Sequence, residues 1–235
     1  MTRVGVVTGM IAESRCLGAA LQETPTANQP IVFCAGASVQ RAHDGARALI
    51  AQGATALMSF GLAGGLAPDA EPGDLLCATD ILDTSGGQWP TTAPWRQALA
   101  AALGSDAEAP LVTSPDPITT IDMKARLHRD SGAVAVDMES AAVAAVAAHA
   151  SLPFVALRVI VDPARRAIPQ SALNGLGPNG EQRPLAVLAA LLTRPGDLPG
   201  LIRLGRDTAR GMRRLRRVAA LGDALFTGPF GGSGG

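Results

Sequence analysis

Short apolar runs alternate with helical segments along the first two thirds of the chain, and this alternation limits the possible folds more than any other feature. Strands are predicted over residues 3–8, 31–34, 54–60, 73–82, 110–113, 133–136 and 154–161. Helices are predicted between them, over residues 13–21, 40–51, 93–103, 121–129 and 138–150. Strands and helices in this order favour a central sheet with helices on both faces. We therefore expect a three-layer α/β/α sandwich with a mixed, largely parallel sheet.

The domain organisation follows from the length and from a change of character after Asp162. The chain has 235 residues, 47% of them apolar, which is enough for one sizeable core. One α/β domain is expected over residues 1–197, including an irregular stretch rich in proline and glycine and a helix at residues 185–192. Residues 198–226 are predicted to form a basic amphipathic helical segment packed on that domain. Residues 227–235 are predicted to be a flexible tail.

The charge is balanced over the whole chain but not along it. Twenty basic and twenty acidic residues cancel, which argues against nucleic acid as a partner. From residue 198 to residue 225, seven arginines stand against two aspartates, a net charge of +5 that leaves −5 on the remainder. Lys124 is the only lysine among the basic residues. We attribute that bias to genome composition and give it no functional weight.

Three classes of protein are disfavoured. Glu13 and Arg15 interrupt the first apolar stretch, so no secretion signal is expected. The longest apolar run, residues 141–148, is too short to cross a bilayer. The three cysteines form no CxxC pair, which disfavours a disulfide framework and a zinc site. We expect a cytoplasmic protein without a metal.

Three carboxylates are predicted to meet at one edge of the sheet. Glu13 follows the first strand, Glu139 lies in the first turn of the helix after residues 133–136, and Asp162 ends an apolar strand. Ligands of α/β folds bind at the carboxyl ends of the strands, where these residues would lie. Local roles stay open as alternatives. A helix start stabilises the carboxylates of Glu13 and Glu139, and Asp162 precedes a proline that ends its strand.

The strand predicted over residues 54–60 is followed by a glycine-rich run, Gly61-Leu62-Ala63-Gly64-Gly65. Small residues at this point let backbone amides approach a ligand closely, although a tight turn would explain the same residues. The spacing differs from the G-x-G-x-x-G of a dinucleotide-binding turn. We therefore expect no nicotinamide cofactor.

Four motifs, taken in order and spacing, carry a resemblance to a known family. They are GMIAES, GLAGGLAPDAEPGDLL, VAVDMESAAVA and PFVALRVIVD, within about residues 3–163. The chain resembles the superfamily of nucleoside phosphorylases and methylthioadenosine/S-adenosylhomocysteine nucleosidases. The SFGLAGGL form and the arginine-rich end are most similar to the hopanoid-associated phosphorylase branch. That branch is implied to remove adenine from adenosylhopane.

The resemblance implies a role for individual residues. Asp162 takes the place of the catalytic aspartate, which would donate a proton or a hydrogen bond to N7 of adenine. Val161 replaces a small polar residue of relatives, which predicts drier surroundings and a protonated Asp162. Glu139 would hold the ribose diol as an ionised carboxylate, with Met138 packed against sugar and base. The remaining implied contacts are Gly9, Ala63 and Gly64 in the nucleoside- or phosphate-binding loop, and Ile118 at the base.

The attacking nucleophile is left open by conflicting signals. Glu13 matches the glutamate with which nucleosidase relatives activate water, and a carboxylate beside phosphate would repel it. Relatives commonly have a hydroxyl residue in place of Leu62, and phosphorylases have an arginine in place of Ser59. The branch label implies phosphorolysis all the same, with phosphate as co-substrate and no other cofactor. The positive charge would then come from Arg15, Arg41, Arg165 or Arg166.

The leading hypothesis is an enzyme that releases adenine from a nucleoside with a large apolar 5′ group. The alternatives are a methylthioadenosine/S-adenosylhomocysteine-type nucleosidase and a non-catalytic carrier of a nucleoside lipid. A lipid substrate would bring the protein to the inner face of the membrane through Leu201, Ile202, Met212 and Leu215, unless the C-terminal helix is simply packed on the core. The resemblance also implies a homo-oligomer, most simply a dimer.

Overall fold

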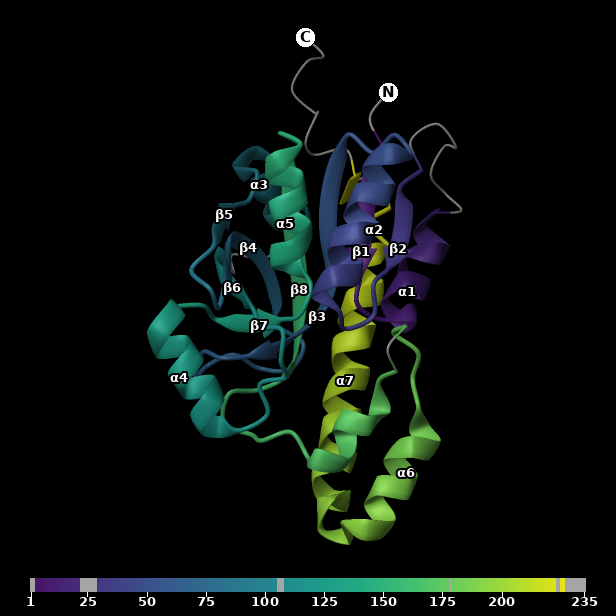
Figure 1. Cartoon of the computed structure of the whole chain (residues 1–235), viewed down its shortest axis with the longest axis vertical. Coiled ribbons are helices and arrows are strands. Elements are labelled where there is room, and N and C mark those ends of the chain that lie inside the picture. Colours follow the sequence, from purple (N-terminus) through teal and green to yellow (C-terminus); the bar gives the residue numbers. More distant parts are fainter. Residues whose placement is uncertain (1–2, 22–28, 105–107, 178, 223–224, 227–235) are drawn as a thin grey trace.

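The computed structural model describes residues 3–21, 29–104, 108–177, 179–222 and 225–226 (Figure 1). The strands are β1 (Val4–Thr8), β2 (Ile31–Cys34), β3 (Ala56–Gly65), β4 (Leu75–Asp83), β5 (Gln88–Pro90), β6 (Glu108–Thr113), β7 (Ala135–Asp137) and β8 (Phe154–Asp162). The helices are α1 (Ile11–Leu21), α2 (Val39–Ala51), α3 (Ala93–Leu103), α4 (Ile121–Ser131), α5 (Ser140–His149), α6 (Pro184–Thr193) and α7 (Leu198–Ala219). Two short 3-10 helices, η2 (Gln170–Gly175) and η3 (Pro195–Asp197), flank α6. The tail predicted at residues 227–235 lies outside the described residues.

The eight strands form one mixed, largely parallel sheet, which confirms the predicted fold class. Parallel pairs join β1 to β2 and β3, β3 to β8, and β6 to β4 and β7. Antiparallel pairs join β4 to β5, β4 to β8, and β3 to β7. The pairing passes from β3 through β8, β4, β6 and β7 back to β3, so these five strands close on themselves. The closure brings the ends of β3, β7 and β8 to one place.

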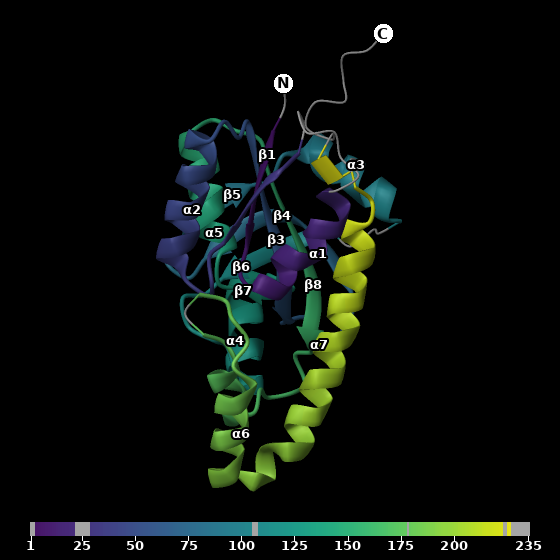
Figure 2. The same cartoon turned by 90° about the vertical axis from the view of Figure 1, so that its right-hand side faces the viewer.

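Helices cover both faces of the sheet (Figure 2). On one face, alanines and valines of α2 and α5 pack against β1, β3 and β8 in one apolar cluster. On the other face, α1, α3 and α7 form a second cluster around Trp95 and Leu215, both fully buried. The small side chains of α5, chiefly alanine, allow this helix to lie close to the sheet. The alanine-rich composition of residues 140–149 is therefore a packing feature.

Two parts of the sheet differ from the sequence prediction. The glycine-rich run is not a turn, because β3 continues through it to Gly65 and pairs with β8 up to Asp162. Glycine disfavours strands locally, but a ladder on a neighbouring strand outweighs that preference. β5 was not predicted, since an edge strand of three residues has no periodic pattern.

The C-terminal helix α7 has two unlike halves. Its second half packs on the sheet, where Met212, Leu215 and Val218 are buried. Its first half continues beyond the sheet beside α6, and together they form the lower end of the molecule in both views (Figures 1 and 2). The prediction that Met212 and Leu215 contact a membrane is therefore wrong, because both side chains belong to the core. We call α6, η3 and residues 198–206 of α7 the α6–α7 arm.

Candidate active site

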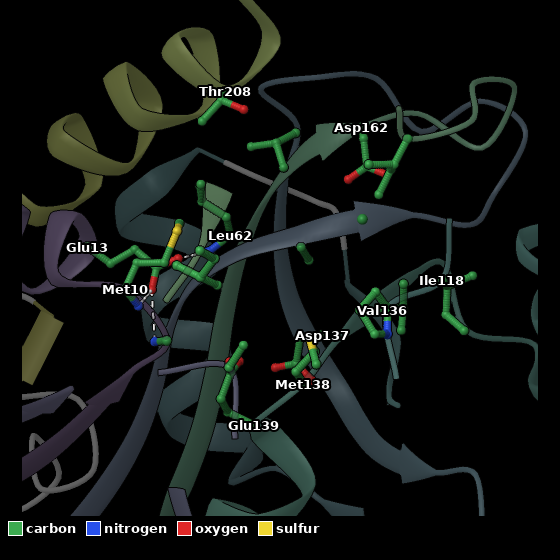
Figure 3. Close-up of a pocket in the computed structure, with 18 of the residues that line it drawn as sticks. Met10, Glu13, Leu62, Ile118, Val136, Asp137, Met138, Glu139, Asp162 and Thr208 are labelled. Atoms are coloured by element: carbon green, nitrogen blue, oxygen red, sulfur yellow. Dashed lines mark hydrogen bonds between the residues drawn. The ribbon is translucent and has the colours of Figure 1, made fainter. Parts of the chain in front are cut away.

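A cavity of about 320 Å³ lies at the carboxyl ends of β1, β3, β7 and β8. Glu13, Glu139 and Asp162 face this space from different sides (Figure 3). All three carboxylates are buried. The structure thus brings together acids that are far apart in the sequence. The cavity is also lined by every other predicted site residue, namely Gly9, Ala63, Gly64, Ile118 and Met138.

The Glu13 carboxylate is held by three backbone amides. Oε2 accepts hydrogen bonds from Gly9 N at 2.9 Å and Met10 N at 2.8 Å, and Oε1 accepts one from Leu62 N at 2.8 Å. Burial raises the pKa of Glu13, while the Arg158 guanidinium and these amides oppose that rise. The result is a fixed carboxyl group in a dry environment.

Glu139 is the N-cap residue of α5 but does not cap the helix. Its side chain makes no cap hydrogen bond, and the amide of Ser140 donates instead to the Asp137 carboxylate, at 3.1 Å from Oδ2. A helix-capping role for Glu139 is therefore wrong, and its carboxyl group is free to face the cavity. Burial, together with the negative charge of Asp137, raises the pKa of Glu139 to about 8. Burial thus favours the protonated form of Glu139, whereas the sequence analysis expected an ionised carboxylate.

A buried polar network lies beneath Glu139. Arg158 in β8 donates to Asp137 Oδ2 from Nε at 2.9 Å and from Nη2 at 2.6 Å, and its Nη2 also donates to Ser59 Oγ at 2.7 Å. The same Nη2 lies 3.8 Å from Glu139 Oε2. Ser59 is therefore a hydrogen-bond partner of Arg158 within this network.

Asp162 forms an ion pair that the sequence analysis missed. Lys124 Nζ, on α4, donates to Asp162 Oδ2 at 2.5 Å and to the carbonyl oxygens of Pro163 and Arg166 at 3.1 and 3.0 Å. Lys124 is fully buried, and all three protons of its ammonium group have an acceptor. Burial raises the pKa of Asp162, and the Lys124 charge opposes that rise. Attributing the single lysine to composition alone is thus wrong.

Each of the three carboxylates lies against a glycine. A Cβ atom on Gly61 would lie 2.8 Å from the Glu13 carboxylate, and one on Gly9 would lie 2.7 Å from Glu139 Oε1. A Cβ atom on Gly64 would lie 3.2 Å from Asp162 Oδ1. Because each of the three has an ordinary backbone conformation, the constraint is one of space. A side chain at Gly9 or Gly61 would displace the carboxylate, whereas one at Gly64 would require Asp162 to shift slightly.

The predicted arginines do not supply an anion site in this cavity, because none of the four lines it. Arg41 donates to Asn179 Oδ1 and to the carbonyl oxygen of Ala35. Arg165 pairs with Glu71, and Arg166 pairs with Asp207. Arg15 is exposed on α1. The amides of Gly9, Met10 and Leu62, which could otherwise bind an anion, already bind Glu13.

The cavity continues into an apolar groove between η2, α6 and α7. The two spaces share Met10, Leu176, Leu204 and Thr208. The groove has a volume of about 690 Å³ and is lined further by the apolar residues Val187, Leu201 and Met212. Its lining also includes Gln182, Arg213 and Arg216. No local pattern predicts this groove, because its walls come from several separate segments, most of them after Asp162.

Two kinds of feature are missing from the described part of the chain. It contains no group of three or more His, Cys, Asp or Glu side chains arranged to hold a metal ion. Within the same residues, no helix is both long enough and apolar enough to cross a membrane.

Known protein families and solved structures agree with the fold described above. The model of the phosphorylase superfamily matches residues 26–192, more than half of the chain. No protein with a curated function matches the chain in sequence. The MTA/SAH nucleosidase of Streptococcus pneumoniae, in complex with 8-aminoadenine, is similar in structure with a TM-score of 0.71 at 15% identity, over 97% of this chain and 100% of that chain.

Two structures from Helicobacter pylori are also similar. Its 5′-methylthioadenosine/S-adenosylhomocysteine nucleosidase has a TM-score of 0.66 at 17% identity, over 92% of this chain and 97% of that chain. Its futalosine hydrolase has a TM-score of 0.63 at 20% identity, over 69% of this chain and 88% of that chain. At these identities the similarity establishes a common fold.

Proposed function

Because the chain belongs to the phosphorylase superfamily, we propose that it cleaves the N-glycosidic bond of an adenine nucleoside with a large apolar 5′ group. One observation carries the proposal: three buried carboxylates line a cavity that opens directly into an apolar groove. The carboxylates match the needs of glycosidic cleavage, and the groove matches an apolar substituent. Adenosylhopane is the substrate we propose, since its 5′ group is a large hydrocarbon.

The leaving base is assigned to Asp162. Cleavage of a ribosyl bond passes through an oxocarbenium-like state in which electrons move into the base, so a proton or hydrogen bond at N7 lowers the barrier. Burial favours the protonated form of Asp162. The Lys124 ammonium fixes one oxygen of the carboxyl group and leaves the other for the base.

The ribose is assigned to Glu139. A protonated carboxyl group can donate to one hydroxyl of the diol and accept from the other. When Glu139 is ionised, its negative charge stabilises the positive charge that develops on the sugar. Met138 and Ile118 supply the apolar walls beside the sugar and base.

Water is the nucleophile that the surroundings of Glu13 favour. A phosphate anion would have to displace the Glu13 carboxylate from three amides and would meet no arginine in the cavity lining. A carboxyl group with a raised pKa is in turn a better base toward water at neutral pH. We therefore propose hydrolysis, with phosphorolysis as the alternative implied by the hopanoid-associated branch.

The proposal is tested by incubating the protein with adenosylhopane, with and without phosphate, and identifying the sugar product by mass. Hydrolysis predicts a free 5′-substituted ribose in both reactions, whereas phosphorolysis predicts a ribose 1-phosphate that depends on phosphate. Asp162→Asn and Glu13→Gln are each expected to lower adenine release by at least about a hundredfold. Unchanged release in either variant would remove that residue from the mechanism.

Two alternatives give different results in the same assay. A methylthioadenosine/S-adenosylhomocysteine-type nucleosidase, favoured by the presence of Glu13, would prefer a small 5′-thio substituent over adenosylhopane. A carrier would bind the nucleoside and release no adenine. Equilibrium binding measured beside adenine release separates the carrier from both enzymes.

A further inference from the structure

The helix α6 is apolar on all sides, yet none of its residues is buried. Its sequence is PLAVLAALLT, and its contacts are chiefly with the neighbouring η2 and η3. Apolar helices in water-soluble proteins normally bury a face in the core. The exposed fraction reaches 79% for Leu185 and 81% for Leu192. This much exposed apolar surface indicates contact with something outside the described chain.

The exposed side chains gather in one part of the molecule. Of the nine large apolar side chains that are exposed in the described residues, six lie between residues 173 and 202. On α6, Leu185, Leu188 and Leu192 follow the spacing of one helix face. Leu198 and Ile202 extend the patch to the first half of α7. The α6–α7 arm that carries them forms one end of the molecule in both views (Figures 1 and 2).

The arm is also basic. Between residues 184 and 206 it has three arginines, Arg194, Arg203 and Arg206, and one acid, Asp197. The three arginines are exposed and form no ion pair within the described residues, whereas Asp197 accepts hydrogen bonds from Ser171. Positive charge beside exposed leucines is typical of segments that bind anionic lipid surfaces.

We propose that the α6–α7 arm docks on the surface of an anionic phospholipid bilayer. Its leucines would enter the boundary between headgroups and acyl chains, and its arginines would contact lipid phosphates. A second copy of this chain is a poorer occupant, because a twofold contact through the arm would place each set of unpaired arginines against its own copy.

The position of the arm gives docking a consequence for the site. Three residues of the arm, Val187, Leu201 and Leu204, line the groove that leads to the three carboxylates. If the proposed function holds, a nucleoside with a lipid-soluble 5′ group can pass between the bilayer and the cavity without crossing water. Docking itself rests only on the arm.

The test is sedimentation of the full chain with vesicles. The protein is expected to sediment with phosphatidylglycerol vesicles and not with phosphatidylcholine vesicles. Replacing both Leu185 and Leu192 by glutamate should lower partitioning by more than about tenfold. Each leucine that enters the bilayer contributes strongly to the free energy of binding. Replacing Arg194, Arg203 and Arg206 by glutamine should lower it by about fivefold for each arginine removed.

Matched controls are available on α4, which lies apart from the arm in Figure 1 and on which Ile121 and Met123 are exposed. Ile121→Glu with Met123→Glu should leave sedimentation unchanged. Equal sedimentation of the Leu185→Glu, Leu192→Glu variant and the parent overturns the inference. The inference is also overturned if the parent does not sediment with anionic vesicles, or if analytical ultracentrifugation shows that it self-associates through the arm. Adenine release from soluble 5′-methylthioadenosine is measured in parallel, so that failure of the proposed function is seen separately from failure of docking.

Discussion

At the scale of single residues, burial raises the pKa values of the acids around the cavity, and these raised values lower the free energy of unfolding. The pKa of Glu139 is about 8 in the folded chain, well above its ordinary value of 4.5. A group whose pKa rises on folding makes the folded state less stable as the pH increases between those two values. This follows because the folded chain must give up a proton that it holds more tightly than the unfolded chain.

Glu139→Gln is therefore expected to stabilise the protein, by about 1–2 kcal/mol at pH 8. The gain should be near zero at pH 4 and should grow as the pH rises towards 8, because glutamine cannot ionise. Urea denaturation across this range measures it. Glu71→Gln serves as the control, since Arg165 lowers the pKa of that exposed carboxyl group. A gain that does not depend on pH would contradict the raised pKa of Glu139.

Among the charged groups near Asp162, Lys124 has the largest effect on the pKa of its carboxyl group. Lys124→Met removes the ammonium group, so the pKa of Asp162 is expected to rise further, and the alkaline limb of the profile of kcat/KM against pH should move to higher pH. Two loop carbonyl oxygens also lose their donor, which should lower the free energy of unfolding by about 1–3 kcal/mol.

The exposed Arg126 on the same helix provides the matched control. Arg126→Met should leave both the pH profile and the stability unchanged. A Lys124→Met variant that is less stable but keeps the parent's alkaline limb would show that Lys124 has only a structural role.

The sequence pattern predicted the three acidic site residues but not the residues that contact them. Glu13, Glu139 and Asp162 were found because each follows a predicted strand, and strand ends meet at one edge. Lys124 lies on a helix whose pattern gives no sign that this position is buried, and its partner is 38 residues away. The raised pKa of Glu139 was likewise hidden, since it depends on burial in the folded chain and on the approach of Asp137.

At the scale of elements, α7 combines a core helix and a surface helix in one segment. Leu215 is fully buried against the sheet, whereas Ile202, about three and a half turns earlier on the same helix, is exposed. Leu215→Ala should lower the free energy of unfolding by about 2–4 kcal/mol through the cavity it leaves. Ile202→Ala should change it by less than about 0.5 kcal/mol. Urea denaturation of both variants measures the contrast, and equal losses would contradict the two-part description of α7.

Elements with strong periodic patterns were predicted well, and the misses have physical causes. β2 and α3 have the predicted bounds, because each is a clear apolar or amphipathic run between breakers. The continuation of β3 through its glycines depends on β8, a partner about a hundred residues later, which no local pattern contains. The amphipathic pattern was recognised over residues 198–226, but it does not say where the sheet ends beneath the helix.

At the scale of the whole molecule, the closed sheet and the α6–α7 arm form different parts of the candidate site. The sheet fixes the carboxylates, and the arm together with α7 forms the groove beyond them. If the groove binds the 5′ group, kcat/KM for a series of 5′-alkylthioadenosines should rise with chain length. Burial of a methylene group contributes about 0.8 kcal/mol, so each added carbon should give an increase of about fourfold until the groove is full.

A large side chain in the groove should abolish this dependence without affecting short substrates. Val187 lines the groove but not the cavity. Val187→Trp is therefore expected to leave kcat/KM for 5′-methylthioadenosine unchanged and to lower it by at least about tenfold for the longest chains. Ala189→Trp, which places the same side chain at an exposed position of α6 outside the groove lining, should behave like the parent. If Val187→Trp kept the parent's dependence on chain length, the 5′ group would have to bind elsewhere, because no long alkyl chain could share the groove with an indole ring.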